Sequence, residues 1–277
     1  MPVPTSPTAA AYARLAEVHP GLTVTELSPH TAPPHGGTWT SAAALAHDPA
    51  ALDAFLAWDD AQVQRDYGTR ARPDVVASFA LHRYAWPACL LVTVPWFLHR
   101  RVPRIPVTHL SYDRTAGRMA LRPASFACLP GDPAAALPGA RVVPGEEALR
   151  AEVRAAVAEH AEPLLAAFGP RMRRRGRALW GMVTDELVES LWYVARLLGE
   201  EERARRELAL LLPGATAPYV GTAAFRELTG PDGAGVPTRD RASCCMFYTV
   251  RPQDTCATCP RTCDADRLPK VSAHAAS

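Results

Sequence analysis

The sequence predicts a predominantly helical α+β protein, with a small β-hairpin or sheet in its N-terminal half and a helical C-terminal half that ends in a cysteine-rich tail. Three observations lead to this fold class. Apolar residues recur at helical spacing in several stretches, one segment alternates as strands do, and five of the seven cysteines lie between residues 244 and 263. With 277 residues and 48% apolar content, the chain is long enough to bury a core without disulfides.

The first hundred residues combine helices with one short extended segment. Tyr12 and Leu15 follow a proline at helical spacing, and Asp48 is a capping residue before a first-turn proline. We expect, in order, a helix over 7–18, a strand over 21–27, a loop over 30–37, a helix from Asp48 to about Gly68 and a helix from Arg72 that ends at Pro87 or Pro95. The stretch 85–98 is apolar on all sides and too short to cross a bilayer, which favours a buried pair of helices.

The strongest β signal is a hairpin over 106–122. Its two strands are expected at 106–112 and 118–122, with Gly117 in the turn between them. A connection rich in proline and glycine follows over 123–144 and is the best candidate for a domain boundary. We therefore predict three parts: an α+β part at 1–135, a helical part at 136–240 and a cysteine-rich cluster-binding segment at 241–277.

The helical part should contain three helices. The first begins after Gly145 with acidic residues in its first turn, where they complement the helix dipole. The longest runs from about Arg174 to Leu198 and ends at Gly199, and a shorter one covers 200–212. The chain is then expected to continue without regular structure from Pro213 into the cysteine-rich segment.

The crowded cysteines have three ordinary explanations, which are disulfides, a zinc site and an iron–sulfur cluster. Disulfides are the least favoured, because the N-terminus has neither the basic nor the apolar region of a secretory signal and the expected compartment is the cytoplasm. Zinc requires two well-spaced ligand pairs, whereas Cys244 and Cys245 are adjacent and point apart in an extended chain. A [2Fe–2S] cluster offers two irons to such a pair, so it is favoured over zinc, which stays open.

The pattern Cys244-Cys245-x10-Cys256-x2-Cys259 resembles the C-terminal signature of the FhuF family of siderophore-iron reductases, which bind an unusual [2Fe–2S] cluster. The resemblance extends to the flanking Arg241, Tyr248 and Pro260, and more loosely to Leu179-Trp180-Gly181 and to residues 72–79. Met182 stands where the family usually has asparagine. The resemblance implies that Cys244, Cys245, Cys256 and Cys259 are the cluster ligands, while Cys263 lies outside the pattern.

The same resemblance implies an enzyme, a cytoplasmic reductase that passes one electron to Fe(III) in an imported siderophore of the hydroxamate class, such as ferrioxamine. No dinucleotide-binding, P-loop, zincin or serine-hydrolase motif is present, so electrons are expected from a ferredoxin or a flavin-dependent reductase. The alternatives are an electron-transfer or iron-sensing iron–sulfur protein without a chelate substrate, and a zinc-stabilised module. A family member that reduces something other than iron also stays open.

The net charge of the chain argues against a nucleic-acid-binding function. The formal net charge is +2, and the densest basic run, 171–177, is not accompanied by a nucleic-acid-binding motif, so neither nucleic acid nor a membrane is an expected partner. This run is expected either to dock an acidic ferredoxin, to attract an anionic chelate or to be a solvated helix end. Four arginines around the cysteines are each expected at the solvated surface: Arg241, Arg251, Arg261 and Arg267.

Overall fold

The computed structural model describes residues 6–276 and confirms a helix-rich α+β fold. Its described helices are α1 (Ala9–Val18), α2 (Ala42–His47), α3 (Pro49–Tyr67), α4 (Pro73–His99), α5 (Glu146–Met172), α6 (Gly176–Leu197), α7 (Glu201–Leu211) and α8 (Asp264–Ala276), with short 3-10 turns at Val107–His109, Pro133–Ala136 and Phe247–Thr249. The first, third, fifth, sixth and seventh of these lie where the sequence predicts helices. The short helices α2 and α8 were not predicted.

The described strands form three small sheets. They are β1 (Thr23–Glu26), β2 (Thr40–Ser41), β3 (Arg101–Arg104), β4 (Leu110–Asp113), β5 (Arg118–Leu121), β6 (Ser125–Cys128), β7 (Ala140–Val142), β8 (Phe225–Thr229) and β9 (Gly235–Arg239). The sheet orders are β1-β5-β4-β2, β3-β6-β7 and β8-β9. The predicted hairpin is β4–β5, which pairs Leu110 with Leu121, and β1 joins its edge in parallel.

Two segments that were predicted to be irregular contain strands. The connection at 123–144 supplies β6 and β7, and the stretch after Pro213 forms the β8–β9 hairpin, with Gly233 at φ +80° in its turn. For β8–β9 the reason is that proline and glycine serve both loops and tight hairpin turns, whereas β6 and β7 are very short strands that pair in parallel across a connection rich in these residues. The C-terminal half is therefore not wholly helical.

Helix α4 is the centre of the protein and is continuous from Pro73 to His99, so the prediction of an end at Pro87 or Pro95 is wrong. A proline inside a helix leaves the carbonyl four residues earlier without its usual donor. For Pro95 this carbonyl is that of Leu91, and the buried hydroxyl of Tyr12 donates to it at 2.7 Å. A side chain from α1 thus replaces the missing backbone bond and lets the helix continue.

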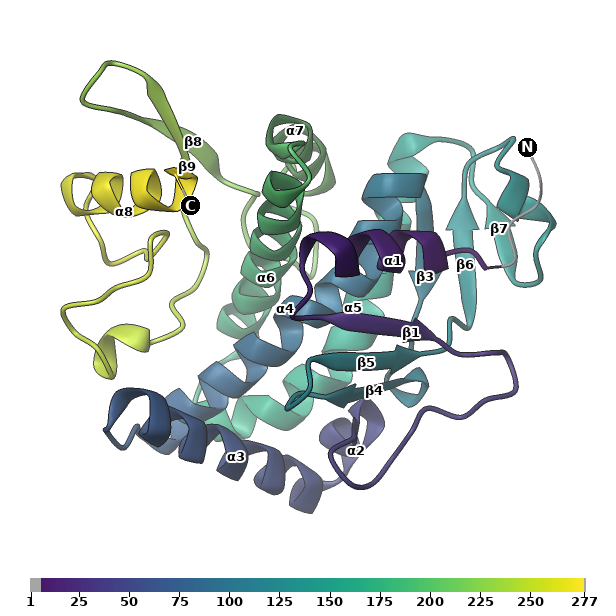
Figure 1. Ribbon diagram of the computed structural model, residues 1–277, viewed down its shortest axis with the longest axis horizontal. Coiled ribbons are helices and arrows are strands. Elements are labelled where there is room, and N and C mark those ends of the chain that lie inside the picture. Colours follow the sequence, from purple (N-terminus) through teal and green to yellow (C-terminus); the bar gives the residue numbers. More distant parts are fainter. Residues whose placement is uncertain (1–5, 277) are drawn as a thin grey trace.

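The main apolar core surrounds α4. Figure 1 shows α4 crossing the middle of the molecule, with α5 and α6 beside it and the β1-β5-β4 strands on the opposite side from the C-terminal segment. Helix α4 has the length and composition of a membrane span, but 83% of that window is buried inside the protein, which confirms the prediction of a buried apolar stretch. Core residues come from both sides of the predicted boundary at 135/136, and the division into three parts stays a prediction.

Candidate metal centre

The cysteines predicted to bind the cluster lie in what we call the cysteine segment, residues 241–263, which runs from the end of β9 to the start of α8. Figure 1 shows this segment and α8 to one side of the helical body, next to the ends of α3 and α4. All seven cysteines of the chain are free thiols. Cys245 and Cys259 are buried, Cys244 and Cys256 are half-buried, and Cys263 is exposed.

The four predicted ligands lie in one segment and interact in pairs, although no group of three or more possible metal ligands is gathered within residues 6–276. The thiols of Cys245 and Cys256 share a hydrogen bond, which lowers the pKa of Cys245 to about 5 and raises the pKa of Cys256. Burial, together with the charges of Cys245 and Cys259, raises the pKa of Cys244. Each of these thiols is therefore within electrostatic reach of others in the set. Cys263 points elsewhere, because its thiol donates to Asp266 at 3.2 Å.

The donor set fits a two-iron cluster better than one zinc ion. Tetrahedral zinc needs all its sulfurs at about 2.3 Å from one centre. A [2Fe–2S] rhomb takes its four thiolates as one pair on each iron, so it accommodates neighbouring thiols that do not close on one point.

The backbone before the first cysteine pair is fixed to helix α6 by Asp185. Strand β9 ends at Arg239, and the N–H of Asp240 still bonds the carbonyl of Ala224 at 3.0 Å, but the N–H groups of Ala242 and Ser243 lie beyond the β8–β9 ladder. The buried carboxylate of Asp185 accepts hydrogen bonds from the backbone N–H of Ala242 and of Ser243, both at 2.8 Å, and from the Ser243 hydroxyl at 2.7 Å. Gly181 of the Leu-Trp-Gly stretch faces this backbone, and a Cβ there would lie 3.4 Å from the Ser243 Cβ, an ordinary contact distance that leaves room for alanine but not for a larger side chain.

Two buried arginines attach the same backbone to the acidic face of α6. Arg239 and Arg241 are two residues apart and point the same way, as alternate residues of an extended chain do. Arg239 pairs with Asp185 at 2.9 Å and with Glu189 at 3.0 Å, and Arg241 pairs with Glu186 at 3.1 Å. Both guanidiniums are at most 5% exposed. The prediction that Arg241 is a solvated residue is therefore wrong.

Helix α4 and the turn before α6 hold the cysteine pair itself. The buried hydroxyl of Ser78 donates to the carbonyl of Cys245 at 3.2 Å, and Arg174 donates to the carbonyl of Cys244 at 2.8 Å. Met182 lies beneath this point, with its sulfur 4.0 Å from the Ser78 hydroxyl. In this chain, the position at which the family usually has asparagine therefore contacts Ser78, the residue that bonds the carbonyl of Cys245.

Helix α8 holds the second pair of cysteines. Arg267 is only 4% exposed, donates to the carbonyl of Cys259 at 3.2 Å and pairs with Asp240 at 2.7 Å. The Thr258 hydroxyl donates to Glu189 at 2.8 Å, which ties the Cys256–Cys259 turn to the same acidic face of α6. Arg267 was also predicted to be solvated, and burial in this role corrects that prediction.

Positive charge next to Cys245 is permanent. Burial alone lowers the pKa of Arg241, but the carboxylates of Glu186, Glu189 and Asp185 outweigh it, so the pKa of Arg241 is raised and the guanidinium stays charged. Its charge in turn favours the thiolate form of Cys245. For His82 burial likewise opposes the charged form, but the Glu186 carboxylate 2.5 Å away raises the pKa.

Sequence reasoning missed the buried charged residues that support the cysteines. Asp185, Glu186 and Glu189 lie within the apolar stripe of α6, and their partner Arg239 lies in a stretch that was predicted to be irregular. The available signal was the presence of three acids among residues otherwise expected to face the core. Acids in such positions are rarely fully buried unless they are paired.

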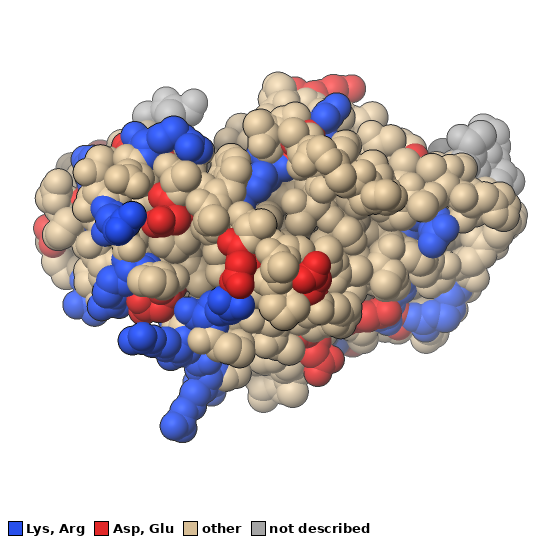
Figure 2. Space-filling model, turned by 90° about the horizontal axis from the view of Figure 1, so that it is seen from below, with Lys and Arg blue, Asp and Glu red and all other residues tan. Residues whose placement is uncertain are grey.

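A basic surface adjoins the first cysteine pair. Arg171, Arg173, Arg175 and Arg177 are exposed around the α5–α6 turn, next to Arg174, which holds Cys244. Figure 2 shows Lys and Arg side chains gathered toward the end of the molecule that carries the cysteine segment. We call residues 171–177 the basic turn.

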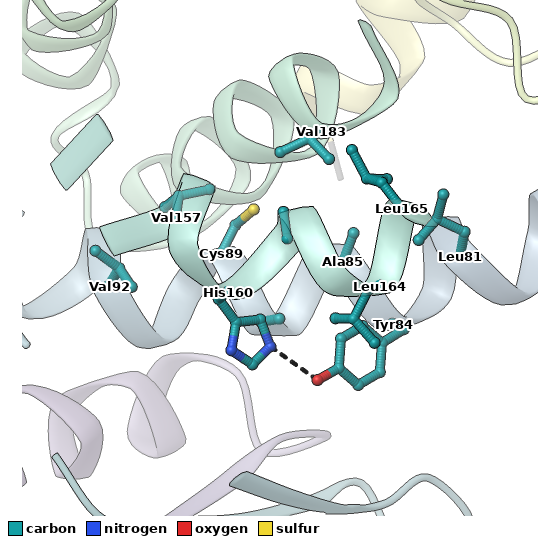
Figure 3. Close-up of a pocket in the computed structure, with 12 residues that line it drawn as sticks. Leu81, Tyr84, Ala85, Cys89, Val92, Val157, His160, Leu164, Leu165 and Val183 are labelled. Atoms are coloured by element: carbon teal, nitrogen blue, oxygen red, sulfur yellow. Dashed lines mark hydrogen bonds between the residues drawn. The ribbon is translucent and has the colours of Figure 1, made fainter. Parts of the chain in front are cut away.

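An enclosed cavity between α4 and α5 is part of the core rather than a substrate site. Its volume is about 30 Å³, little more than one water molecule occupies, and its lining is apolar apart from Tyr84, Cys89 and His160. Figure 3 shows the Tyr84 hydroxyl hydrogen-bonded to the His160 ring, at 2.9 Å. Burial lowers the pKa of His160, whose other nitrogen faces the carbonyl of Ile105 at 2.8 Å, so this ring is neutral.

Comparison with known families agrees with this geometry. It assigns the cysteine segment to the two-iron class of iron–sulfur domains. Residues 241–261 match the family model described as the FhuF 2Fe-2S C-terminal domain, and the match includes the four predicted ligands but not Cys263. No curated protein matches the chain. The predicted resemblance and the [2Fe–2S] cofactor are therefore confirmed for this segment, while the assignment of each ligand stays a prediction.

Proposed function

We propose that this protein is a cytoplasmic ferric-siderophore reductase that delivers one electron to Fe(III) in a hydroxamate chelate and so releases Fe(II). The observation that carries the proposal is the gathering of Cys244, Cys245, Cys256 and Cys259 inside a segment that matches the FhuF 2Fe-2S domain. When bound, the cluster supplies one electron at a time. Hard hydroxamate oxygens hold Fe(III) far more tightly than Fe(II), so a single electron suffices to loosen the metal.

The residues of this chain adapt the site to that reaction. Arg241 is a permanent positive charge next to Cys245, but Asp185, Glu186 and Glu189 pair with it and with Arg239, so this network holds the cysteine pair in place without adding net positive charge. Burial of Cys245 and Cys259 limits access of water to their sulfurs. The ion pairs of α6 hold both cysteine turns on one helix, so little reorganisation accompanies the change of charge.

The basic turn supports an acidic one-electron carrier, such as a ferredoxin, as the donor. Its exposed arginines adjoin Arg174, which bonds the carbonyl of Cys244, so a donor bound there faces the more accessible cysteine of the pair. Complementary charge accelerates such encounters and makes them sensitive to salt. Reduction by ferredoxin should therefore slow as ionic strength rises, and more steeply than reduction by a flavin-dependent reductase without an acidic docking face.

The test uses anaerobically purified protein. Visible absorption and EPR spectra are recorded before and after dithionite, and ferrioxamine is then added together with a chromogenic Fe(II) chelator. Reoxidation of the cluster with one Fe(II) trapped per protein supports the reductase. A cluster that stays reduced supports electron transfer or sensing instead, and a colourless protein with stoichiometric zinc contradicts the cluster.

A pair of cysteine variants tests the ligand assignment. Cys245→Ser should lose the cluster absorption and the bound iron, because this thiol is buried and contacts Cys256. Cys263→Ser should keep both, because the Cys263 thiol is exposed and bonded to Asp266. If Cys263→Ser loses the cluster and Cys245→Ser keeps it, then Cys263 is a ligand and Cys245 is not.

A further inference from the structure

A broad groove lies between α1, α3, α4 and α6, next to the cysteine segment. Its volume is about 600 Å³, which is in the range of sites that bind a small molecule. Its lining is unusually aromatic for an open surface: Trp58 from α3, Trp86 from α4, Tyr112 from β4 and Tyr193 from α6. Tyr193 is 43% exposed, a large fraction for an aromatic side chain.

The aromatic wall is preassembled. Trp86 and Tyr193 pack edge to face with ring centroids 5.7 Å apart, and His19 contacts both rings. Trp58 is held on the other side by Arg114, whose guanidinium lies 4.2 Å from the ring centroid. Ring faces held in this way offer apolar contact area at a low cost in side-chain entropy.

The groove reaches the cysteine pair through His82. His82 belongs to its lining and lies one helical turn after Ser78, so both side chains are on the same face of α4. Ser78 bonds the carbonyl of Cys245, while His82 contacts Glu186, which in turn pairs with Arg241. The residue that lines the groove and the residue that bonds the carbonyl of Cys245 are therefore neighbours on one face of α4.

A second link leads to the other cysteine turn. Tyr193 lines both the groove and a neighbouring hollow of about 190 Å³, which Ala257 and Thr258 also line. These two residues lie between Cys256 and Cys259 in the sequence. Tyr193 therefore lies between the groove and the hollow beside the Cys256–Cys259 turn.

The charges of the groove are balanced. Arg83 and Arg114 both pair with the buried carboxylate of Asp59, at 2.9 and 2.6 Å, and Arg83 is also 4.0 Å from Asp66. Two guanidiniums thus face two carboxylates. Three singly charged hydroxamates neutralise Fe(III), whereas three catecholates leave the complex strongly anionic. Aromatic walls with balanced charge suit the neutral complex.

We propose that this groove binds the ferric chelate, with Tyr193, Trp86 and Trp58 as its walls and His82 as the contact toward the cluster. This inference rests on the proposed reductase function and names the substrate site. In the reaction the ferric ion gains one electron and becomes Fe(II), and the external donor replaces that electron. No atom is transferred, so the groove has only to hold the complex against α4.

The test separates binding from reduction by using gallium. The Ga(III) complex of a cyclic desferrioxamine, which has three hydroxamates and no free amine, has the shape and the neutral charge of the ferric complex but is not reducible, so its affinity for the holoprotein is measured by calorimetry. Tyr193→Ala and Trp58→Ala should each weaken binding about tenfold and raise KM for ferrioxamine, with unchanged cluster absorption. Leu210→Ala, on the exposed face of α7, is the matched control and should change neither. A Ga(III) tris-catecholate should bind at least tenfold more weakly than the hydroxamate.

Unchanged affinity in both aromatic variants, or tighter binding of the catecholate, would overturn the groove assignment even if the protein reduces ferrioxamine. Conversely, gallium binding that depends on Tyr193 and Trp58 in a protein that leaves ferrioxamine unreduced would support the groove and refute the reductase. The two proposals therefore fail by different results.

Discussion

Replacing Asp185 by asparagine should detach the cysteine segment from α6. The substitution keeps the size of the side chain but removes its charge, and its amide presents a donor to groups that are themselves donors. Those groups are the backbone N–H of Ala242 and Ser243, the Ser243 hydroxyl and the buried guanidinium of Arg239. At least one of these donors is then left buried without an acceptor.

The expected loss is about 3 kcal/mol of unfolding free energy. Removing one partner of a buried ion pair costs about 3–5 kcal/mol. The low end applies because Arg239 keeps Glu189 at 3.0 Å and Arg241 keeps Glu186 at 3.1 Å. Since domains are stable by only about 5–15 kcal/mol, this is a large fraction of the total.

Anaerobic urea unfolding measures the effect, with far-UV circular dichroism for the helices and visible absorption for the cluster. With a urea slope of about 3 kcal/mol/M, the upper end of the usual range, the midpoint should fall by about 1 M. Cluster absorption should disappear at a lower urea concentration than the helical signal, because Asp185 holds the cysteine segment rather than the helical core.

The matched control is Glu202→Gln, which also neutralises an acid on a helix, but at a side chain that is 75% exposed and pairs with the exposed Arg206. Exposed pairs of this kind contribute less than about 1 kcal/mol. If Asp185→Asn unfolds at the same urea concentration as Glu202→Gln, and with its cluster intact, then the buried network does not support the cysteine pair and the reasoning is refuted.

Substitutions at three further positions test other parts of the fold by the same urea assay. Tyr12→Phe should cost about 1–3 kcal/mol, because the carbonyl of Leu91 then stays buried without a donor; no loss would mean that another group reaches it. Gly181→Ala should be neutral or stabilising by up to about 1 kcal/mol, since its Cβ would meet Ser243 at an ordinary 3.4 Å, whereas Gly181→Val should destabilise. Burial lowers the pKa of His160, so as the pH falls the unfolded chain takes up this proton before the folded protein does. The free energy of unfolding should therefore decrease as pH drops below about 6.5, by at most about 1.4 kcal/mol per pH unit for this group. His160→Gln should make this decrease smaller between pH 7 and 5.

The cysteine segment could be predicted from the sequence because the residues that define it lie close together in the chain. Adjacent cysteines and a C-x2-C knuckle lie within one short window, and their spacing alone favours a two-iron group over zinc. The family resemblance came from the same residues. Helices with strong apolar periodicity were predicted for the same reason, since a 3.6-residue repeat needs no knowledge of the partner that it packs against.

The tertiary structure decided what supports and surrounds the cysteines. Asp185 and Arg239 are ordinary surface-type residues in the sequence, and only the packing of β9 onto α6 buries both and pairs them. Tyr12 donates to the carbonyl of Leu91, which Pro95 leaves without its helical donor, although Tyr12 and Leu91 are 79 positions apart in the chain. The groove likewise draws its aromatic residues from three helices and a strand.

By itself, the sequence determined the helix-rich α+β class, the positions of the long helices and the cysteine set of a [2Fe–2S] segment. It did not determine the burial of Arg241 and Arg267, the course of α4 through Pro87 and Pro95, or the β8–β9 hairpin. The physical reason is that helical periodicity and the spacing of the cysteines depend on residues that are close together in the chain. Burial, charge pairing and a binding groove exist only where distant segments meet.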